Sequence, residues 1–523
     1  MGLHIFRLLC KILVATILFH GSCYSDKDGQ YTFMKDAIVA PTYASFDYIV
    51  IGGGTSGCAL ATTLSQNASV LVLERGGSPY DNLTATDLGN VIPSSWSQPF
   101  TSKDGVDNQR ARVLGGGTVI NGGFYTRAGD DYVAEAKWEM EDVESAYEWI
   151  EKKLVFKPQV KGWQSAYLKG LLEADVTPYN GFTYEHINGT KIGGTLFDIG
   201  GHRHSAADLL KYANPDKIVV YLNATVHKIL FTTKGDQKLK AHGVIYKDRD
   251  GVFHKAELAE NVMNEVILSA GALGSPQLLM LSGVGPRAHL EAHGVNPVVR
   301  DHPMVGKGMG DNPMSGVVIP SPLPVEMVPP ANVGITKFGS FVEGAALDSL
   351  SQTPSIKSNS GLIVEKVDGP VSRGYLELQN TNPDDNPSVK FNYYQEHEDL
   401  EKCVIGLETI IKVIDSKAFS KYKYPNATAI ELLSLMLSPQ TAVSNLTQYC
   451  IDTVRTIFHY HGGCQVGRVV DKNYKVFGID SLRVIDGSTF LKSPGTNPQA
   501  TVLMLGRYMG QKIIQDRVSF GGK

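Results

Sequence analysis

Tyr48-Ile49-Val50-Ile51-Gly52-Gly53-Gly54-Thr55-Ser56-Gly57 decides the fold of this chain, together with Val70-Leu71-Val72-Leu73-Glu74 downstream. The apolar run predicts a strand that ends in a tight turn, and the Ala- and Leu-rich segment 58–64 predicts the helix that follows. Gly52 allows the turn, Gly54 lets the backbone approach a pyrophosphate, and Gly57 lets the helix pack on the strand. Glu74 would end the next strand, where a carboxylate accepts hydrogen bonds from a ribose diol. The unit predicts a dinucleotide site, for FAD or a nicotinamide cofactor, rather than a glycine-rich turn that binds nothing.

The composition is that of a large folded protein. The chain has 523 residues, of which 42% are hydrophobic and 20% charged, and its net charge is -4. This length predicts more than one domain. The charges give no basic field, so we expect no nucleic-acid partner.

Residues 1–25 predict a secretory signal peptide, with Arg7 and Lys11 ahead of the apolar run 12–19. That run is too short to span a bilayer, so a signal anchor is the less favoured alternative and no stable membrane span is expected. We therefore expect the protein in the secretory pathway, extracellular or vacuolar. Sequons compatible with N-glycosylation lie at Asn67, Asn82, Asn188, Asn223, Asn426 and Asn445. Removal of the signal would leave Cys58, Cys403, Cys450 and Cys464, whose spacing fits no zinc site but allows a disulfide.

Two later segments repeat the physics of the opening unit. Gly115-Gly116-Gly117-Thr118 precedes a small-residue helix start, which predicts a backbone close to something flat or anionic, with a flexible hinge as the alternative. The apolar strand 265–268 leads into Ser269-Ala270-Gly271-Ala272 and a helix, and we expect Pro276 in its first turn.

The texture of the chain changes between residues 301 and 445, which are Pro-rich, then polar, then strand-like at 374–378. This change predicts a second, β-rich domain inserted in the first. The predicted limits are 1–25 for the signal peptide, 46–150, 201–300 and 446–523 for the cofactor-binding domain, and 151–200 and 301–445 for the substrate-binding domain.

His459-Tyr460-His461-Gly462-Gly463 is the candidate for acid–base chemistry, because an imidazole can act as a general base near neutral pH. The alternative is that at least one of the two histidines is only packed and hydrogen-bonded. A metal site is disfavoured because a third ligand is missing nearby, and hydrolysis is disfavoured because the chain has no G-x-S-x-G elbow. The helix predicted at 498–514 has a positive N-terminus that could face the pyrimidine edge of an isoalloxazine, which favours flavin over nicotinamide.

Four separated motifs, in the expected order, resemble those of the glucose-methanol-choline (GMC) flavoenzymes, and within them the plant branch of HOTHEAD-like and (R)-mandelonitrile lyase-like proteins. They are 112–121, 269–277 with 281–285, 486–489, and 495–501. The resemblance covers nearly all of the chain after the predicted signal peptide. It implies an α/β, Rossmann-like FAD-binding domain that is discontinuous in sequence, with an inserted α+β substrate-binding domain.

The resemblance also implies the site residues. His459 would be the active-site base, and Asn497 would occupy the position of the second catalytic residue. FAD would be bound by Gly52, Gly54, Gly57, Glu74, Arg112, Gly115, Gly116, Thr118, Asn121, Val226, Asp486, Gly487, Asn497, Pro498 and Gln499. No His lies in 115–124, where some relatives link the flavin covalently, so we expect non-covalent FAD. Similar plant sequences pair the cysteines at the positions of Cys403 and Cys450.

The chain departs from that pattern in places. Gly117-Thr118 replaces paired serines, Phe458 stands where the plant lyases have Trp, and the inserted domain is shortened around 348–360. Those lyases also carry His where this chain has Asn497.

Two reactions compete on this pattern, and both begin when His459 takes a hydroxyl proton. In alcohol oxidation, hydride then passes to FAD and the Asn497 amide donates to the developing alkoxide. In cyanohydrin cleavage, departing cyanide must be protonated, which suits a second imidazole better than an amide that cannot titrate. We therefore favour oxidation of a small-molecule alcohol, keep the (R)-mandelonitrile lyase reaction on a cyanohydrin as the alternative, and rank a non-catalytic flavoprotein last.

Overall fold

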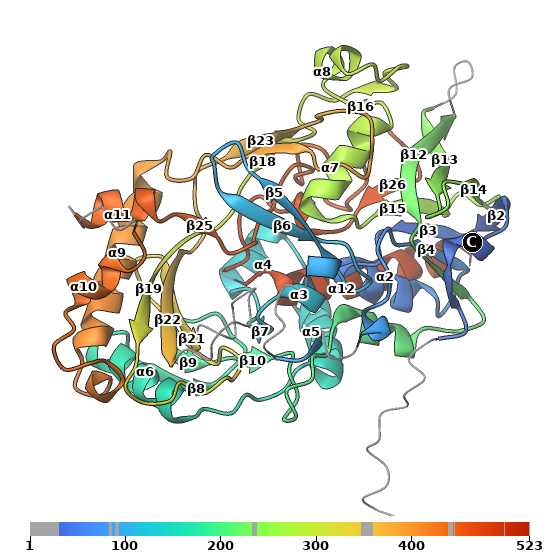
Figure 1. Ribbon diagram of the computed structural model, residues 1–523. Coiled ribbons are helices and arrows are strands. Elements are labelled where there is room, and N and C mark those ends of the chain that lie inside the picture. Colours follow the sequence, from blue (N-terminus) through green and yellow to red (C-terminus); the bar gives the residue numbers. More distant parts are fainter. Residues whose placement is uncertain are drawn as a thin grey trace, which may run out of the picture.

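The computed structural model describes residues 31–82, 86–88, 94–232, 238–346, 359–437, 443, 445–495 and 497–521. The predicted signal peptide lies outside the described residues, as does the segment 348–360 except for its last two residues. Figure 1 shows one lobe that holds the N-terminal and C-terminal helices, and a second lobe built mostly from the middle of the chain.

A parallel six-stranded sheet forms the centre of the first lobe. Its strand order is β1 (Met34–Asp36), β11 (Ile218–Leu222), β4 (Val70–Leu73), β3 (Tyr48–Ile51), β15 (Glu265–Leu268) and β26 (Leu482–Val484). Adjacent strands run parallel throughout. Strand β3 lies between β4 and β15, so the chain reverses its direction of travel across the sheet at this point, where α/β proteins bind their ligands. The predicted Rossmann-like α/β domain is confirmed.

Helix α2 (Thr55–Leu64) packs on β3 and β4 and is covered in turn by α12 (Gln499–Gly521). The two helices approach closely, because a Cβ built on Gly506 would lie 2.3 Å from the Ser56 carbonyl oxygen. The first and last helical segments of this domain are therefore packed directly together (Figure 1).

A seven-stranded sheet forms the second lobe. Its order is β25 (Arg455–Thr456), β19 (Pro313–Pro320), β22 (Ser360–Val367), β21 (Ser340–Ala346), β20 (Asn332–Ile335), β9 (Gly189–Ile192) and β8 (Tyr179–Phe182). Helices α6 (Gly162–Glu173) and α9 (His397–Asp415) cover one face, where Trp163, Ile363 and Leu407 lie in a separate core. The inserted α+β domain is thus present. Its core includes Tyr449 and Cys450, whereas the first core includes Leu376 and Val389, and the exact domain limits stay predictions.

The remaining elements complete the two lobes. The other helices are α3 (Gly117–Ile120), α4 (Asp130–Ala136), α5 (Met140–Leu154), α7 (Gly271–Leu281), α8 (Arg287–Ala292), α10 (Ala429–Ser434) and α11 (Leu446–Asp452). A four-stranded sheet joins β12 (Thr225–Thr232), β13 (Lys240–Lys247), β14 (Phe253–Leu258) and β2 (Tyr43–Phe46). The short strands are β5 (Ser97–Thr101), β6 (Asp107–Ala111), β7 (Phe124–Tyr125), β10 (Gly194–Thr195), β16 (Val284–Gly285), β17 (Arg300–Asp301), β18 (Lys307–Met309), β23 (Gly374–Glu377) and β24 (Ser388–Lys390).

Pro276 lies inside α7 and not in its first turn, so that prediction was wrong. The helix begins earlier because buried Asp486 binds its start. The Asp486 carboxylate accepts hydrogen bonds from the Gly271 N–H, at 2.9 Å, and from the Ser275 hydroxyl, at 2.5 Å. These contacts satisfy a donor at the helix N-terminus that would otherwise be unpaired.

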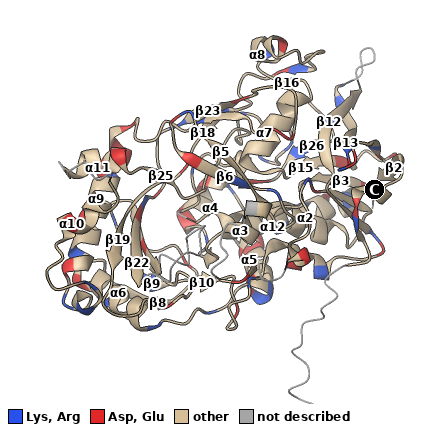
Figure 2. Cartoon of the chain, viewed as in Figure 1, with Lys and Arg blue, Asp and Glu red and all other residues tan. Residues whose placement is uncertain are grey.

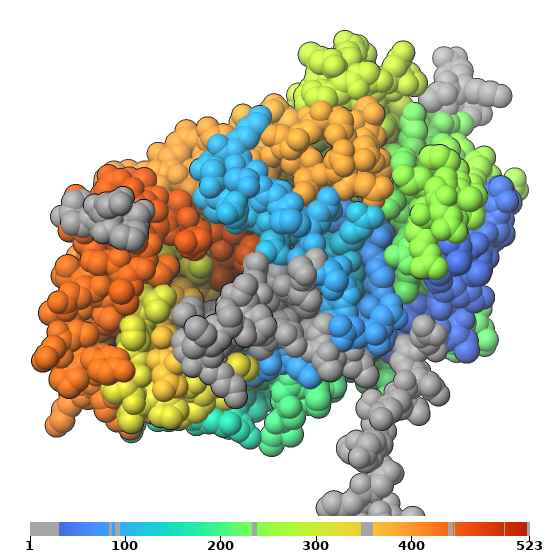
Figure 3. Space-filling model, in the orientation of Figure 1, coloured from blue at the N-terminus to red at the C-terminus, as the bar shows by residue number. Residues whose placement is uncertain are grey.

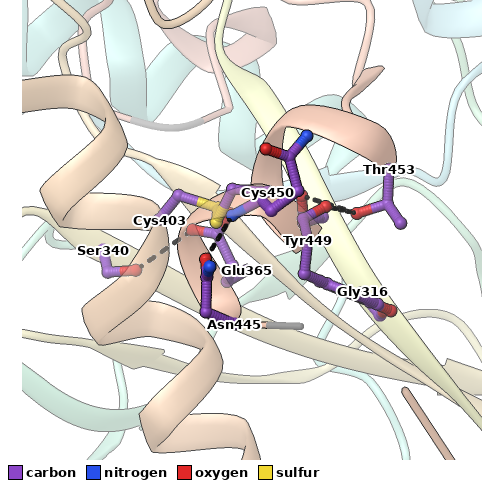
Figure 4. Close-up of a disulfide and its surroundings, with 10 residues drawn as sticks. Gly316, Ser340, Glu365, Cys403, Asn445, Tyr449, Cys450 and Thr453 are labelled. Carbon is purple, nitrogen blue, oxygen red and sulfur yellow. Dashed lines mark hydrogen bonds between the residues drawn. A yellow bond between two sulfur atoms is a disulfide. The ribbon is translucent and has the colours of Figure 1, made fainter. Parts of the chain in front are cut away.

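The disulfide Cys403–Cys450 joins α9 to α11, as the resemblance implied (Figure 4). The Tyr449 hydroxyl, beside the bridge, donates to the Gly316 carbonyl of β19 at 2.7 Å. The bridge spans 47 residues of sequence, and closing such a loop stabilises the fold by about 4 kcal/mol through the unfolded state. The bridge and the tyrosine together fix the helices to the outer part of the second sheet.

Charged residues of both signs are interspersed over the chain (Figure 2). The surface in Figure 3 shows the light-blue segment near residue 100 against the orange segment near residue 385, where Gln98 Nε2 donates to the Asp384 carbonyl at 2.7 Å. Within the part of the chain that the structure describes, no helix has both the length and the apolar character to cross a bilayer.

Candidate active site

The opening glycine motif forms a tight turn between β3 and α2. Gly52 has φ +98°, and a Cβ on it would lie 2.5 Å from the Ser269 carbonyl oxygen. A Cβ on Gly57 would lie 2.0 Å from the Gly52 carbonyl oxygen, so only glycine allows the helix to start this close to the strand. On Gly54, the nearest atom to such a Cβ would be 3.8 Å away. A Cβ at Gly54 would therefore meet the protein only at ordinary van der Waals distances, at the position where the motif predicts a pyrophosphate.

The second glycine cluster packs directly against the first. The Gly115 N–H donates to the Gly53 carbonyl at 2.7 Å, and a Cβ on Gly116 would lie 2.9 Å from the Gly54 Cα. Residues 115–123 are therefore a second glycine loop in contact with the first, and not a free hinge.

A cavity of about 500 Å³ lies between these loops, the carboxyl ends of the parallel strands and the second sheet. We call the part formed by residues 52–56, the ends of β3, β4 and β15, and loop residues 116–123 the glycine wall. The predicted site residues that line the cavity are Gly52, Gly54, Glu74, Gly116, Asn121, Val226, His459, Asp486, Gly487, Asn497, Pro498 and Gln499. The structure thus brings together residues from five distant parts of the chain.

Four predicted cofactor residues are not among the described residues that line this cavity: Gly57, Arg112, Gly115 and Thr118. The two glycines, Gly57 and Gly115, serve the packing just described. The Thr118 hydroxyl donates to the Gly115 carbonyl at 2.7 Å and accepts from the Ala206 N–H at 2.9 Å, which holds the second glycine loop in shape. Arg112 forms an ion pair with Asp384 at 2.8 Å. These four residues therefore hold the surrounding backbone in place and do not line the cavity themselves.

Glu74 lies at the end of β4, where the ribose-binding acid was predicted. Its carboxylate accepts hydrogen bonds from the N–H groups of Gly53, at 2.9 Å, and Gly76, at 2.7 Å. Burial raises its pKa, and these two N–H groups oppose that shift. A carboxylate accepts about four hydrogen bonds, so two positions remain for the hydroxyls of a ribose.

These residues fit the FAD that the sequence implied. Ser56 Oγ borders the cavity in the first turn of α2, is buried, and has no hydrogen-bond partner among the described residues. The first N–H groups of that ten-residue helix and this hydroxyl supply the donors that a pyrophosphate needs. At the other end, Gln499 starts α12, and its Oε1 accepts from Asn121 Nδ2 at 2.8 Å. This contact joins the second glycine loop to the helix whose positive end was predicted to face the flavin.

His459 is half-buried and borders the cavity. Burial is the main cause that lowers its pKa well below the usual value, and the positive charge of Lys366 adds to it, followed by His461. The imidazole is therefore neutral at physiological pH. A neutral imidazole at a cavity wall can accept a proton.

The loop that carries His459 is held by a buried carboxylate. Asp311 accepts from the His459 backbone N–H at 3.0 Å, from the Thr456 hydroxyl at 2.7 Å and from the Tyr393 hydroxyl at 2.5 Å. Burial raises the pKa of Asp311 to about 6. Phe458, which also borders the cavity, has φ +62°, a costly left-handed conformation for a bulky residue. These contacts fix the position of His459.

His461 points elsewhere. It is buried, is not among the described residues that line the cavity, and its Nδ1 lies 3.1 Å from the His459 carbonyl oxygen. Burial, with Arg373 nearby, lowers its pKa to about 3. The geometry gives the two histidines different environments, and only one borders the cavity.

One face of the second sheet closes the cavity opposite the glycine wall. Alternate residues on three adjacent strands point to it: Met314 on β19, Glu343 and Ala345 on β21, and Leu362, Val364 and Lys366 on β22. We call these six residues the sheet wall. Four are apolar, and the other two form an ion pair with Lys366 Nζ 2.5 Å from Glu343 Oε2. This pair was missed in the sequence analysis. The pattern that could have revealed it is a lysine and a glutamate within apolar strands, each at an alternate position that faces the same way as the apolar wall residues.

Comparison with known proteins places this site in a family. The GMC oxidoreductase models match residues 46–314 and 370–506. The chain is 47% identical to Protein HOTHEAD of Arabidopsis thaliana, over 91% of this chain and 89% of that protein. It is 44% identical to an (R)-mandelonitrile lyase-like protein of the same plant, over 93% of each. It is 42% identical to the sinalpyl alcohol oxidase Nec3 of Nesocodon mauritianus, over 91% of this chain and 90% of that protein.

Solved structures share the fold. A formate oxidase of Aspergillus oryzae superposes with a TM-score of 0.77 at 19% identity, over 92% of this chain and 100% of that chain. The pyridoxine 4-oxidase of Mesorbium loti gives a TM-score of 0.76 at 20% identity, over 89% and 98%.

Proposed function

The chain belongs to the GMC oxidoreductase family of FAD-dependent enzymes, and on that basis we propose that it oxidises an alcohol, with His459 as the base and Asn497 as a hydrogen-bond donor. The observation that carries this proposal is that a neutral histidine and an asparagine border the same cavity.

His459 would take the hydroxyl proton of the substrate. It acts as a base only while neutral, and its burial and the charge of Lys366 keep it so. FAD, when bound, supplies the acceptor for the hydride that leaves the carbinol carbon. The Asn497 amide would donate to the substrate oxygen as negative charge develops there, which is worth most in a site shielded from water. The apolar part of the sheet wall would exclude water and contact the substrate.

Cyanohydrin cleavage is the second candidate, supported by the identity to a lyase-like relative. It would use the same proton transfer to His459. Departing cyanide must then gain a proton, and an asparagine amide does not titrate. This chemical difference favours oxidation.

An anaerobic mixing experiment separates the two. The purified yellow protein is mixed with aromatic and long-chain alcohols and, separately, with mandelonitrile. We expect alcohols to bleach the flavin absorbance. Release of benzaldehyde and cyanide without bleaching would overturn the proposal.

We also propose that FAD is bound non-covalently and that the protein passes through the secretory pathway. The second glycine loop lacks the histidine that some relatives use for a covalent link. Five sequon asparagines are exposed: Asn67, Asn82, Asn188, Asn426 and Asn445. Asn223 is half-buried, and its Nδ2 donates to Asp36 at 2.8 Å, so it would be the sequon that stays unmodified. Denaturing extraction followed by absorbance, and glycopeptide mass spectrometry, test these proposals.

A further inference from the structure

A buried lysine of the sheet wall borders the same cavity as the proposed catalytic pair and contacts one of its members. The Lys366 side chain is 0% exposed, and its Nζ lies 3.3 Å from Asn497 Oδ1 and 2.5 Å from Glu343 Oε2. The same Nζ lies over the Phe341 ring, 4.4 Å from its centroid. Three neighbours therefore hold the ammonium group on different sides.

Sheet geometry fixes this arrangement. Lys366 is directly opposite Phe341, and Glu343 is opposite Val364, so the lysine and the glutamate are diagonal neighbours on one face. A single buried charge would be costly, and the glutamate offsets that cost. Because the pair is anchored on two adjacent strands, the ammonium cannot turn away from the cavity without breaking the ion pair.

The lysine decides which way the Asn497 amide faces. An ammonium group has donors and no acceptor, so its neighbour on Asn497 must be the carbonyl oxygen. The amide NH₂ is then directed to another side, and Asn497 borders the cavity. The oxygen and the NH₂ group of an amide are nearly equal in size. Without the contact with Lys366, the Asn497 amide could therefore rotate by 180° and exchange the two.

We propose that Lys366, held by Glu343, is a positioning residue that fixes the Asn497 carboxamide with its NH₂ group available to the substrate oxygen. This inference rests on the proposed function. It deepens that proposal, because Asn497 can stabilise an alkoxide only as a donor. The lysine itself does not need to touch the substrate.

The same charge also acts on His459. The charged and titratable groups near this histidine are Lys366 from β22, His461 from its own loop, and the carboxylate of Asp311, which accepts its backbone N–H. The amide Nδ2 of Asn312 lies 3.5 Å from its Nδ1. After burial, the lysine contributes most to lowering the pKa of His459. Removing it would raise that pKa, so the protonated form would persist to higher pH.

The first test is a double-mutant cycle on the rate of anaerobic flavin reduction, with the alcohol that bleaches the enzyme fastest as the probe. We expect Lys366→Met to lower this rate by about 10- to 100-fold, the loss typical of a misplaced catalytic group. The rates are compared at a pH at which His459 is neutral in every variant. In the Asn497→Ala background the same substitution should then change the rate less than about 2-fold, because the group it positions is gone. Equal losses in both backgrounds, or no loss in either, would overturn the proposal.

A matched control removes a different buried lysine. Lys191 is also 0% exposed and donates to the Thr126 hydroxyl at 2.8 Å, but it is not among the described residues that line the cavity. Lys191→Met should leave the reduction rate within about 2-fold while costing stability. Lys366→Arg, which keeps the charge and the donors, should recover part of the rate that Lys366→Met loses. If Lys191→Met lowered the rate as much as Lys366→Met, the loss would be a general effect of removing a buried lysine, and our interpretation would be wrong.

The second test needs no turnover. Carbon-13-labelled histidine in the holoenzyme allows the pKa of His459 to be followed by NMR, with His459→Gln used to assign its signal. We expect a higher pKa in Lys366→Met, or in Lys366→Gln if the methionine variant does not fold, and an unchanged value would contradict the charge effect of Lys366 on His459. If no alcohol bleaches the unaltered enzyme, the proposed function fails, whereas this titration still shows whether the lysine charge acts on His459.

Discussion

The glycine wall and the sheet wall enclose the same cavity but are built on different principles. The glycine wall is mostly backbone: N–H groups, glycines and one carboxylate at the ends of parallel strands. The sheet wall is made of side chains on alternate positions of three antiparallel strands. At Gly52 and Gly116 the backbone wall has no room for an added Cβ, whereas a side-chain wall can change its chemistry one residue at a time. We therefore expect the glycine wall to hold the cofactor and the sheet wall to select the substrate.

The largest effect should come from breaking the turn that supports the glycine wall. Gly57→Ala places a Cβ 2.0 Å from the Gly52 carbonyl oxygen, so α2 cannot start where it does. We expect the purified protein to be colourless and to melt at a lower temperature. Gly54→Ala is the control, because its Cβ has 3.8 Å of clearance. The apoprotein of Gly54→Ala should keep the melting temperature of the unaltered apoprotein, while its binding of FAD weakens. A Gly57→Ala protein that is yellow and stable would contradict this prediction.

Removal of the proposed base should have the next largest effect. We expect His459→Ala to lower the rate of flavin reduction by ~10²-fold or more while FAD remains bound. His461→Ala should lower it less, since that ring lies behind the loop and not at the cavity. Stopped-flow measurement on both variants checks this order, and a reversed order would identify the wrong histidine.

A change in the sheet wall should alter substrate binding and leave the cofactor in place. Leu362→Ala removes apolar contact at the cavity, and we expect KM for an apolar alcohol to rise by about 10-fold. Its neighbour Ile363 points to the opposite face, into the second core. Ile363→Ala should therefore cost about 2–5 kcal/mol of stability and leave KM unchanged. Steady-state kinetics and calorimetry on the pair would show whether the faces are separated in this way.

The smallest effect should be seen in the pH dependence of the rate of flavin reduction. A base must be neutral, so activity is present above its pKa and is lost as pH falls through it. The pKa of His459 is held well below its usual value, so we expect no half-loss of the reduction rate at pH 6.5, the ordinary pKa of histidine. A limb near pH 6 would instead belong to Asp311, and Asp311→Asn should remove it. A midpoint at 6.5 that persists in this variant would contradict the prediction.

The two walls also differ in how far sequence could predict them. Glycine spacing and the acid at the end of β4 are local patterns with a fixed physical meaning, so the Rossmann-like fold, a dinucleotide site and the candidate Glu74 followed from them. FAD followed from the helix predicted at 498–514 and from the family resemblance. Lys366 and Glu343 were missed because a charge in a strand is normally solvent-exposed, and only the pairing of β21 with β22 shows that these two are buried together. Thr118 was assigned to the cofactor, yet its hydroxyl bonds Ala206, 88 residues away. Such a contact has no local signature.

The packing of α12 on α2 has a consequence for how the protein is made. The first glycine motif leaves the ribosome long before the edge strand β26 and the helix α12 that covers α2. Until those segments emerge, the apolar surface of α2 lacks its cover and Asn497 cannot contact Lys366. The active site is therefore complete only after α12 has been synthesised, and a product truncated ahead of Asn497 and α12 would carry the cofactor motif without either of them.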